Sequence, residues 1–135
     1  MRDRAVLDTG VIVAIYFDED ASERAVEVAS KHSPITLDLA VAEVGNAAWK
    51  RVAFFGESKD VTWKSLYKCL EFIKSCSQIS SFELAELAYE ISVENKTTFY
   101  DSLFLAAAEK ERVPLYTLDK KMYEKVKAKR DVQMV

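Results

Sequence analysis

The stretch "AVLDTGVIVAIYF" at residues 5–17 decides the fold. Residues 5–8 are a short run suited to a buried strand that ends at Asp8, whereas "VIVAIYF" after Gly10 is typical of a short buried helix. A strand that leads directly into a helix is the opening unit of a layered α/β protein. Asp8 therefore stands at the end of the first strand.

The tripeptide Asp8-Thr9-Gly10 also has two alternative interpretations, and both fail. Pepsin-like and retroviral proteases carry their catalytic aspartate in Asp-Thr-Gly, but their fold is nearly all β. Three glycines and two prolines are too few for the turns that such a chain needs. Haloacid-dehalogenase-like phosphatases need a second Asp two residues after the first, where this chain has Gly10.

Further strands and helices alternate along the rest of the chain. Strands are predicted at residues 35–37, 114–118 and 132–135. Helices are predicted from Ser22 to about Lys31, after Asp38, from Ser58 or Asp60 to about Cys76, from Ser81 to about Asn95, from Thr98, and after Leu118. This order predicts a parallel sheet covered by helices on both faces, in one domain over residues 1–135.

Composition and targeting signals limit the class of protein. No apolar run approaches the roughly 18 to 20 residues that a membrane span needs, and the first residues lack a signal peptide. We expect a cytoplasmic protein. Cys69 and Cys76 lie two turns apart in a predicted helix, beyond disulfide reach, and are expected to be buried thiols. His32 is the only histidine and is placed in a polar loop, so zinc sites and His-based triads are excluded.

Charge is distributed unevenly. Residues 110–130 hold eight Lys or Arg and three acids, a local charge of +5, although the whole chain carries −3. Such a basic segment can contact phosphates, or it can be a solvated lysine-rich terminal helix. Charge alone leaves both interpretations open.

Four acids occupy related positions. Asp8 ends the first strand and Asp119 follows the strand at residues 114–118, while Asp101 and Glu43 lie near the starts of two helices. Parallel sheets gather ligands beyond the carboxyl ends of their strands. We therefore expect the four acids at one rim, although each could instead cap or flank a helix, as Asp38 is expected to do.

An all-oxygen cluster favours a hard cation. Two carboxylates about 4 Å apart repel by roughly 4 kcal/mol at an effective dielectric near 20, so a cation or protonation must relieve them. Mg²⁺ or Mn²⁺ suits such ligands and can activate water for phosphodiester hydrolysis. Thr117 lies two residues before Asp119, on the same side of the strand, where its hydroxyl can orient that carboxylate or a metal-bound water.

The four acids Asp8, Glu43, Asp101 and Asp119 occur, in this order, in the segments "LDTGVIVA", "AVAEVGNAAWK", "TTFYDSLFLAAAE" and "LYTLDKKM". Over residues 4–134, this order resembles the PIN-domain ribonucleases, most closely the toxins of VapBC toxin–antitoxin pairs. The resemblance implies a three-layer α/β/α sandwich in which the four acids bind Mg²⁺ or Mn²⁺ and cleave RNA. It also implies supporting roles for Thr117 and, one turn after Glu43, for Asn46.

The resemblance further implies partners. VapBC-like toxins form dimers or dimers of dimers, and they receive an antitoxin segment in a groove beside the acids. Residues 54–72 contain five aromatic side chains, which we expect to pack in the core, with a partner surface as the alternative: Phe54, Phe55, Trp63, Tyr67 and Phe72. A PIN-like module that binds RNA or protein without significant catalysis is the alternative function.

Overall fold

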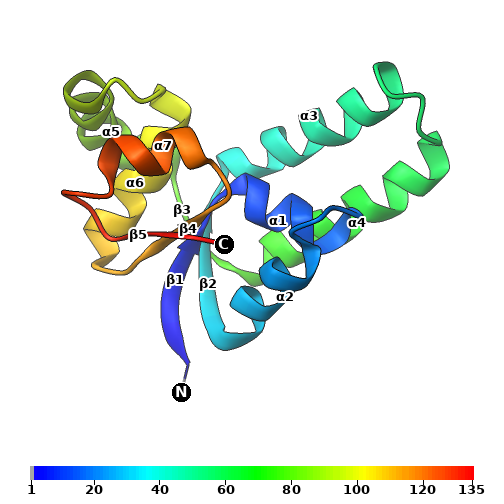
Figure 1. Cartoon of the computed structure of the whole chain (residues 1–135), viewed down its shortest axis with the longest axis horizontal. Coiled ribbons are helices and arrows are strands. Elements are labelled where there is room, and N and C mark those ends of the chain that lie inside the picture. Colours follow the sequence, from blue (N-terminus) through cyan, green and yellow to red (C-terminus); the bar gives the residue numbers. More distant parts are fainter. Residues whose placement is uncertain (1) are drawn as a thin grey trace.

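A computed structural model describes residues 2–135, and its centre is a five-stranded parallel sheet (Figure 1). The strands are β1 (Asp3–Leu7), β2 (His32–Leu37), β3 (Ser77–Ile79), β4 (Leu115–Thr117) and β5 (Val132–Met134). Their order across the sheet is β3-β2-β1-β4-β5. Central strand β1 pairs on both sides: Val6 lies beside Ile35 of β2 and beside Leu115 of β4.

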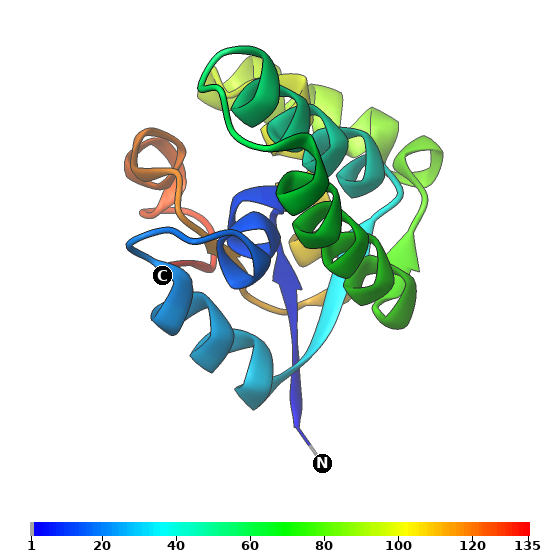
Figure 2. The ribbon, with the colours of Figure 1, turned by 90° about the vertical axis from the view of Figure 1, so that its right-hand side faces the viewer.

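Seven helices cover the two faces of the sheet within the described residues (Figures 1 and 2). One face carries α1 (Thr9–Tyr16), α2 (Ser22–Lys31), α3 (Leu39–Ala53) and α4 (Lys59–Ser75). The other carries α5 (Ser81–Asn95), α6 (Phe99–Glu111) and α7 (Lys120–Val126). The protein is thus a three-layer α/β/α sandwich, as predicted.

The side chains of β1 point alternately to the two faces of the sheet, and the hydrophobic core is accordingly divided into two clusters. Successive side chains of a strand point to opposite faces, so Leu7 packs beneath α1 to α4 while Val6 packs beneath α5 to α7. Both side chains are fully buried. Residues 102–108 of α6 are all buried, which explains why this stretch is nearly continuous in apolar and small residues.

Polar side chains begin most of these helices. Ser58 and Thr98 accept hydrogen bonds from the backbone N–H groups three residues later, as N-caps do. Asp38 accepts from Leu39 N at 2.9 Å and from the Ser81 backbone N–H at 3.0 Å, so that it joins the starts of α3 and α5. The expectation that Asp38 serves as a cap is confirmed.

Two local predictions differ from the structure. Strand β3 was not predicted, because its three residues include a single apolar side chain. His32 was placed in a polar loop, but it is the first residue of β2, and its Nδ1 lies 2.8 Å from the Val28 carbonyl oxygen. Cys69 and Cys76 are buried free thiols, as expected.

The prediction that the aromatic residues of 54–72 pack in the core is wrong for four of the five. Phe54, Phe55, Trp63 and Tyr67 are 66%, 74%, 55% and 52% exposed. Only Phe72 is partly buried, with its ring 5.9 Å from that of Tyr16. The physical reason is that α3 and α4 form a hairpin that extends beyond the sheet, where no second layer covers it (Figures 1 and 2).

No helix within residues 2–135 is both long enough and apolar enough to cross a membrane.

Candidate active site

The candidate site lies where β1 and β4 run side by side. The chain passes from β1 outward to β2 and β3, and then crosses back to β4 on the other side of β1. Parallel sheets bind ligands at such a reversal of strand order, beyond the carboxyl ends of the strands. Asp8 follows β1 at this point, and its backbone N–H donates to the Tyr116 carbonyl oxygen of β4 at 3.3 Å.

All four predicted acids line one pocket of about 190 Å³ at this rim: Asp8, Glu43, Asp101 and Asp119. Each comes from a different segment. Asp8 and Asp119 follow β1 and β4, Glu43 comes from α3, and Asp101 lies in the first turn of α6. The four side chains, up to 111 positions apart in the sequence, are therefore brought to one cleft.

Asp8 is the most strongly perturbed of these acids. Burial raises its pKa from 3.8 to about 7, and the negative charges of Asp101 and Asp119 add to the rise. Hydrogen bonds from the Thr117 hydroxyl to Oδ2 and from Val11 N to Oδ1 (3.2 Å) oppose it. A metal-free pocket therefore holds Asp8 partly protonated near neutral pH.

Glu43 and Asp101 also have raised pKa values, and burial is the main cause for both. The Thr9 hydroxyl donates to Glu43 Oε1 at 2.6 Å and partly opposes the rise. For Asp101, the charge of Asp119 adds to the effect of burial, whereas a hydrogen bond with Thr98 and the positive charge of Lys125 oppose it. Burial and neighbouring negative charge thus act in the same direction on these two carboxylates as on Asp8.

Thr117 lies beside the acids, but the carboxylate that it contacts differs from the predicted one. Its buried hydroxyl donates to the Asp8 carboxylate on the adjacent strand rather than to the carboxylate of Asp119. The same oxygen accepts from Asp119 N at 3.0 Å. Asp119 Oδ1 instead accepts from Met122 N at 3.0 Å and caps α7. Thr117 thus links the ends of β1 and β4.

Asn46 lies outside the acid pocket. It is exposed on α3 and lines an adjoining groove of about 810 Å³, which also contains Lys50 and Tyr100. Within residues 2–135, no hydrogen bond joins the Asn46 side chain to any of the four acids. The structure therefore gives no contact through which Asn46 would support Glu43.

The donor set of the pocket suits Mg²⁺ or Mn²⁺, because its four acids provide carboxylate oxygens and no nitrogen or sulfur ligand. The side chains are not arranged as a finished ligand cage. Among residues 2–135, no three His, Cys, Asp or Glu side chains are placed so that they could already hold a metal ion. The carboxylates are instead engaged by protein donors: Thr117 and Val11 on Asp8, Thr9 on Glu43, Met122 on Asp119, and Thr98 on Asp101.

Sequence reasoning missed two residues near the acids. Thr9 orients Glu43, and its position directly after Asp8 was the only available signal. Lys125 provides the positive charge near Asp101, and its Nζ donates to the Lys96 carbonyl oxygen at 2.8 Å. No sequence signal distinguished Lys125 from the other lysines of residues 110–130.

Three of the eight basic residues in 110–130 are ion-paired. Lys110, Lys127 and Arg130 form ion pairs with Glu83, Glu124 and Glu109, respectively. The other five, Arg112, Lys120, Lys121, Lys125 and Lys129, form no ion pair within residues 2–135, so the pairing does not decide between a solvated surface and a phosphate contact. Lys125, beside Asp101, is the member of the segment that bears on the acid pocket.

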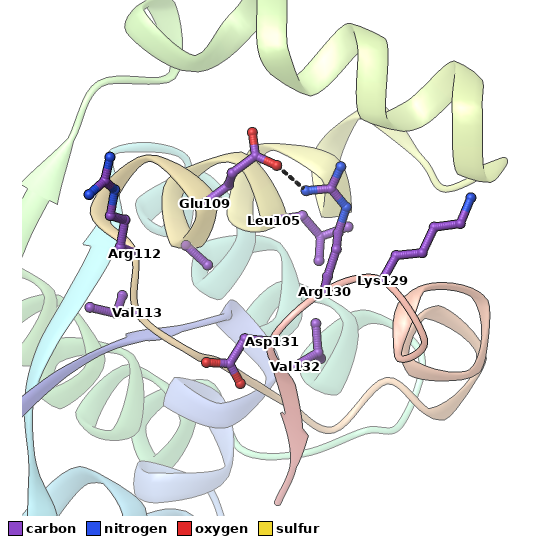
Figure 3. A pocket seen from close by; sticks show the side chains of 9 residues that line it. Leu105, Glu109, Arg112, Val113, Lys129, Arg130, Asp131 and Val132 are labelled. Atoms are coloured by element: carbon purple, nitrogen blue, oxygen red, sulfur yellow. Dashed lines mark hydrogen bonds and ion pairs between the residues drawn. The ribbon is translucent and has the colours of Figure 1, made fainter.

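A separate cavity of about 330 Å³ lies at the other end of α6 (Figure 3). Its basic residues do not converge: Arg112 and Lys129 lie on opposite sides of it, and Arg130 turns to Glu109, with Nη1 2.6 Å from Oε1. Asp131 adds a further negative charge. The mixture of charges does not define an anion site, and none of the four predicted acids lines this cavity.

Comparison with known proteins identifies the class that this fold and site define. The family model of the PIN domain matches residues 5–128, so the chain belongs to the PIN-domain family. Ribonuclease VapC3 of Pyrobaculum aerophilum is 33% identical over 126 residues, which cover 93% of this chain and 96% of that protein.

Solved structures agree on the fold. PAE2754 from Pyrobaculum aerophilum superposes with a TM-score of 0.74 at 24% identity, covering 100% of this chain and 92% of that one. A toxin–antitoxin complex from Klebsiella pneumoniae contains a chain with a TM-score of 0.71 at 18% identity, covering 96% and 95%. The resemblance to PIN-domain proteins of VapBC pairs is confirmed.

Proposed function

We propose that this protein is a metal-dependent endoribonuclease that acts as the toxin of a type II toxin–antitoxin pair. The observation that carries the proposal is the single pocket lined by four carboxylates from four segments, three of them with raised pKa values. Perturbed acids that share one cleft are typical of functional sites. The relationship to a ribonuclease at 33% identity supports RNA as the substrate.

In this proposal Asp8, Asp101 and Asp119 hold Mg²⁺ or Mn²⁺, and Glu43 binds it directly or through water. A cation held by these residues would supply the means to activate water for attack on a phosphodiester and to stabilise the leaving oxygen. Thr117 and Thr9 orient the Asp8 and Glu43 carboxylates by the hydrogen bonds described above. Because burial raises the pKa of Asp8 to about 7, Asp8 must lose a proton to bind the cation, so cation affinity should increase as the pH rises through neutrality.

The proposed biological setting is a cytoplasmic complex with an antitoxin. The exposed aromatic side chains of the α3–α4 hairpin support a protein partner, because a large apolar patch on a soluble protein commonly marks an interaction site. A chain of the same fold occurs in a Klebsiella pneumoniae toxin–antitoxin complex. We further propose a homodimer or a dimer of dimers built from single-domain subunits.

A second candidate is a PIN-like module that binds RNA or a protein without significant catalysis. The absence of a ready-made metal group among residues 2–135 is the observation that favours it. Cation binding by the purified protein separates the two, because a module without catalysis has no need of the metal.

Cleavage of a structured RNA by the purified protein tests the proposed function. We expect cutting in Mg²⁺ or Mn²⁺ that disappears in EDTA and falls by at least about 100-fold in the Asp8→Asn variant, with the fold preserved by circular dichroism. Cutting that survives in Asp8→Asn would instead indicate a contaminating nuclease. No cutting of several RNAs would favour the binding module.

A further inference from the structure

The proposed mechanism assigns no function to the groove beside the acid pocket, which Asn46, Lys50 and Tyr100 line. It lies between α3, the start of α1 and the tip of α6, and shares four lining residues with the acid pocket: Thr9, Gly10, Glu43 and Leu118. Its volume of about 810 Å³ falls within the roughly 300 to 1,000 Å³ of small-ligand pockets. An RNA strand whose phosphate reaches the acids can therefore continue directly into this groove.

The wall formed by α3 changes from acidic to basic with distance from the acids. Glu43, Asn46 and Lys50 all line the groove from α3, and Lys50 lies about 10 Å beyond Glu43 along the helix axis. Within residues 2–135, Lys50 forms no ion pair and the Asn46 amide forms no hydrogen bond. The groove thus offers one unneutralised ammonium group and one free amide near the acids.

Among the described residues, Glu19 is the only acid besides Glu43 that lines the groove, and it forms an ion pair. Glu19 Oε2 lies 2.7 Å from Nη2 of Arg51, which lies outside the groove and also pairs with Glu57. Lys50 is therefore the groove's uncompensated cation among the described residues, and it can contact a phosphate one or two linkages from the scissile bond.

An aromatic ring lies on the opposite wall, next to Asp101. Tyr100 lies in the first turn of α6, lines the groove, and is 60% exposed. Within residues 2–135 its ring has no aromatic partner and its hydroxyl no hydrogen bond. Exposed aromatic rings are the surfaces on which proteins stack the bases of single-stranded RNA.

We propose that this groove is a subsite for an unpaired nucleotide next to the scissile phosphate. Tyr100 stacks on its base and Lys50 contacts the neighbouring phosphate. The inference rests on the proposed ribonuclease function and deepens it, because it specifies single-stranded rather than duplex RNA beside the cleavage site. A protein segment is the competing occupant of the same groove.

Binding of a short fluorescent single-stranded RNA, measured by anisotropy in EDTA so that no cleavage occurs, tests the proposal. We expect Tyr100→Ala to weaken binding at least about fivefold, because base–aromatic stacking contributes that much in other proteins. Tyr100→Phe keeps the ring and should bind within about twofold of the unmodified protein. Tyr89→Ala is the matched control, because Tyr89 is similarly exposed (64%) on α5 but does not line the groove.

Two further measurements separate stacking from a structural effect. The loss caused by Tyr100→Ala should vanish on an abasic RNA of the same length, and the variant's melting temperature should be unchanged. Lys50→Ala should reduce the slope of log Kd against log salt by about 0.7, as expected for one phosphate contact on a single strand.

The outcomes distinguish this inference from the proposed function. Metal-dependent cleavage together with unchanged RNA binding by Tyr100→Ala would overturn the nucleotide subsite, leave the nuclease intact, and favour a protein segment in the groove. Equal losses on abasic and normal RNA would also overturn it. If the unmodified protein neither binds nor cleaves RNA, both the subsite and the proposed function fail.

Discussion

Asp8 combines two roles that a sequence can only treat as alternatives. Its Oδ1 accepts from Val11 N, as an N-cap does, and the same carboxylate lines the acid pocket and accepts from Thr117. Asp119 behaves in the same way, with Met122 N as its capping donor. A helix cap and a site residue are therefore compatible at the end of a parallel strand, because the following helix starts at the rim where ligands bind.

The raised pKa of Asp8 has a consequence for stability. The pKa of the Asp8 carboxyl is about 7 in the folded protein and near 3.8 in the unfolded chain. The stability that its protonated form contributes is therefore fully present only below about pH 4. That contribution is lost as the pH rises to about 7. We expect Asp8→Asn, which cannot ionise, to stabilise the metal-free protein by up to on the order of 4 kcal/mol at pH 8, and by little at pH 4.

Urea unfolding in EDTA across this pH range measures the effect. Asp60→Asn, an exposed acid in the first turn of α4, is the control and should show no comparable pH dependence. A stability difference between Asp8→Asn and the unmodified protein that stays constant from pH 4 to pH 8 would contradict the account of Asp8.

At the scale of the element, caps and apolar spacing predicted the helices well. Ser58 or Asp60, and Thr98, were expected to begin helices, and Ser58 and Thr98 each accept a backbone hydrogen bond at the helix start. Asp119, for which a cap was the alternative to a site role, does the same. Strand β3 escaped prediction because a three-residue edge strand depends on its pairing with β2 rather than on its own residues. The type of an element could be predicted from the sequence, but its tertiary environment could not.

The tertiary environment of the α3–α4 hairpin could not be predicted from the sequence either. Its helices were predicted, but the exposure of Phe54 and Phe55 depends on how far the hairpin extends past the sheet. Helical spacing alone does not distinguish a residue that faces the core from one that faces a partner. The aromatic residues of this hairpin were for that reason assigned to the core.

The exposure of the hairpin tip predicts that Phe55→Ser changes the free energy of unfolding by less than about 0.5 kcal/mol. Phe55 is 74% exposed and therefore leaves no cavity when it is shortened. The matched core variant Ile73→Ala, on α4 at 1% exposure, should cost about 2 to 5 kcal/mol. Denaturant unfolding at two protein concentrations measures both. A loss above about 2 kcal/mol for Phe55→Ser that shrinks on dilution would show that the tip is buried between copies of the chain.

At the scale of the whole molecule, the topology explains why the acids were predictable as a group. Knowing that the sheet is parallel places Asp8 and Asp119 at one rim without knowing the strand order. The adjacency of β1 and β4, which lets Thr117 bond to Asp8, required the fold itself. The groove beside the acids is also a property of the assembled molecule, because α1, α3, α6 and the segment after β4 all contribute to it.

The central claim is that the four carboxylates act as one cation site. Titration of the purified protein with Mn²⁺, followed by electron paramagnetic resonance of the free ion, tests it most directly. We predict saturable binding that weakens at least about tenfold in Asp8→Asn, Glu43→Gln, Asp101→Asn and Asp119→Asn, but not in Asp60→Asn. Binding that is absent in the unmodified protein, or equally strong in all five variants, would contradict the claim.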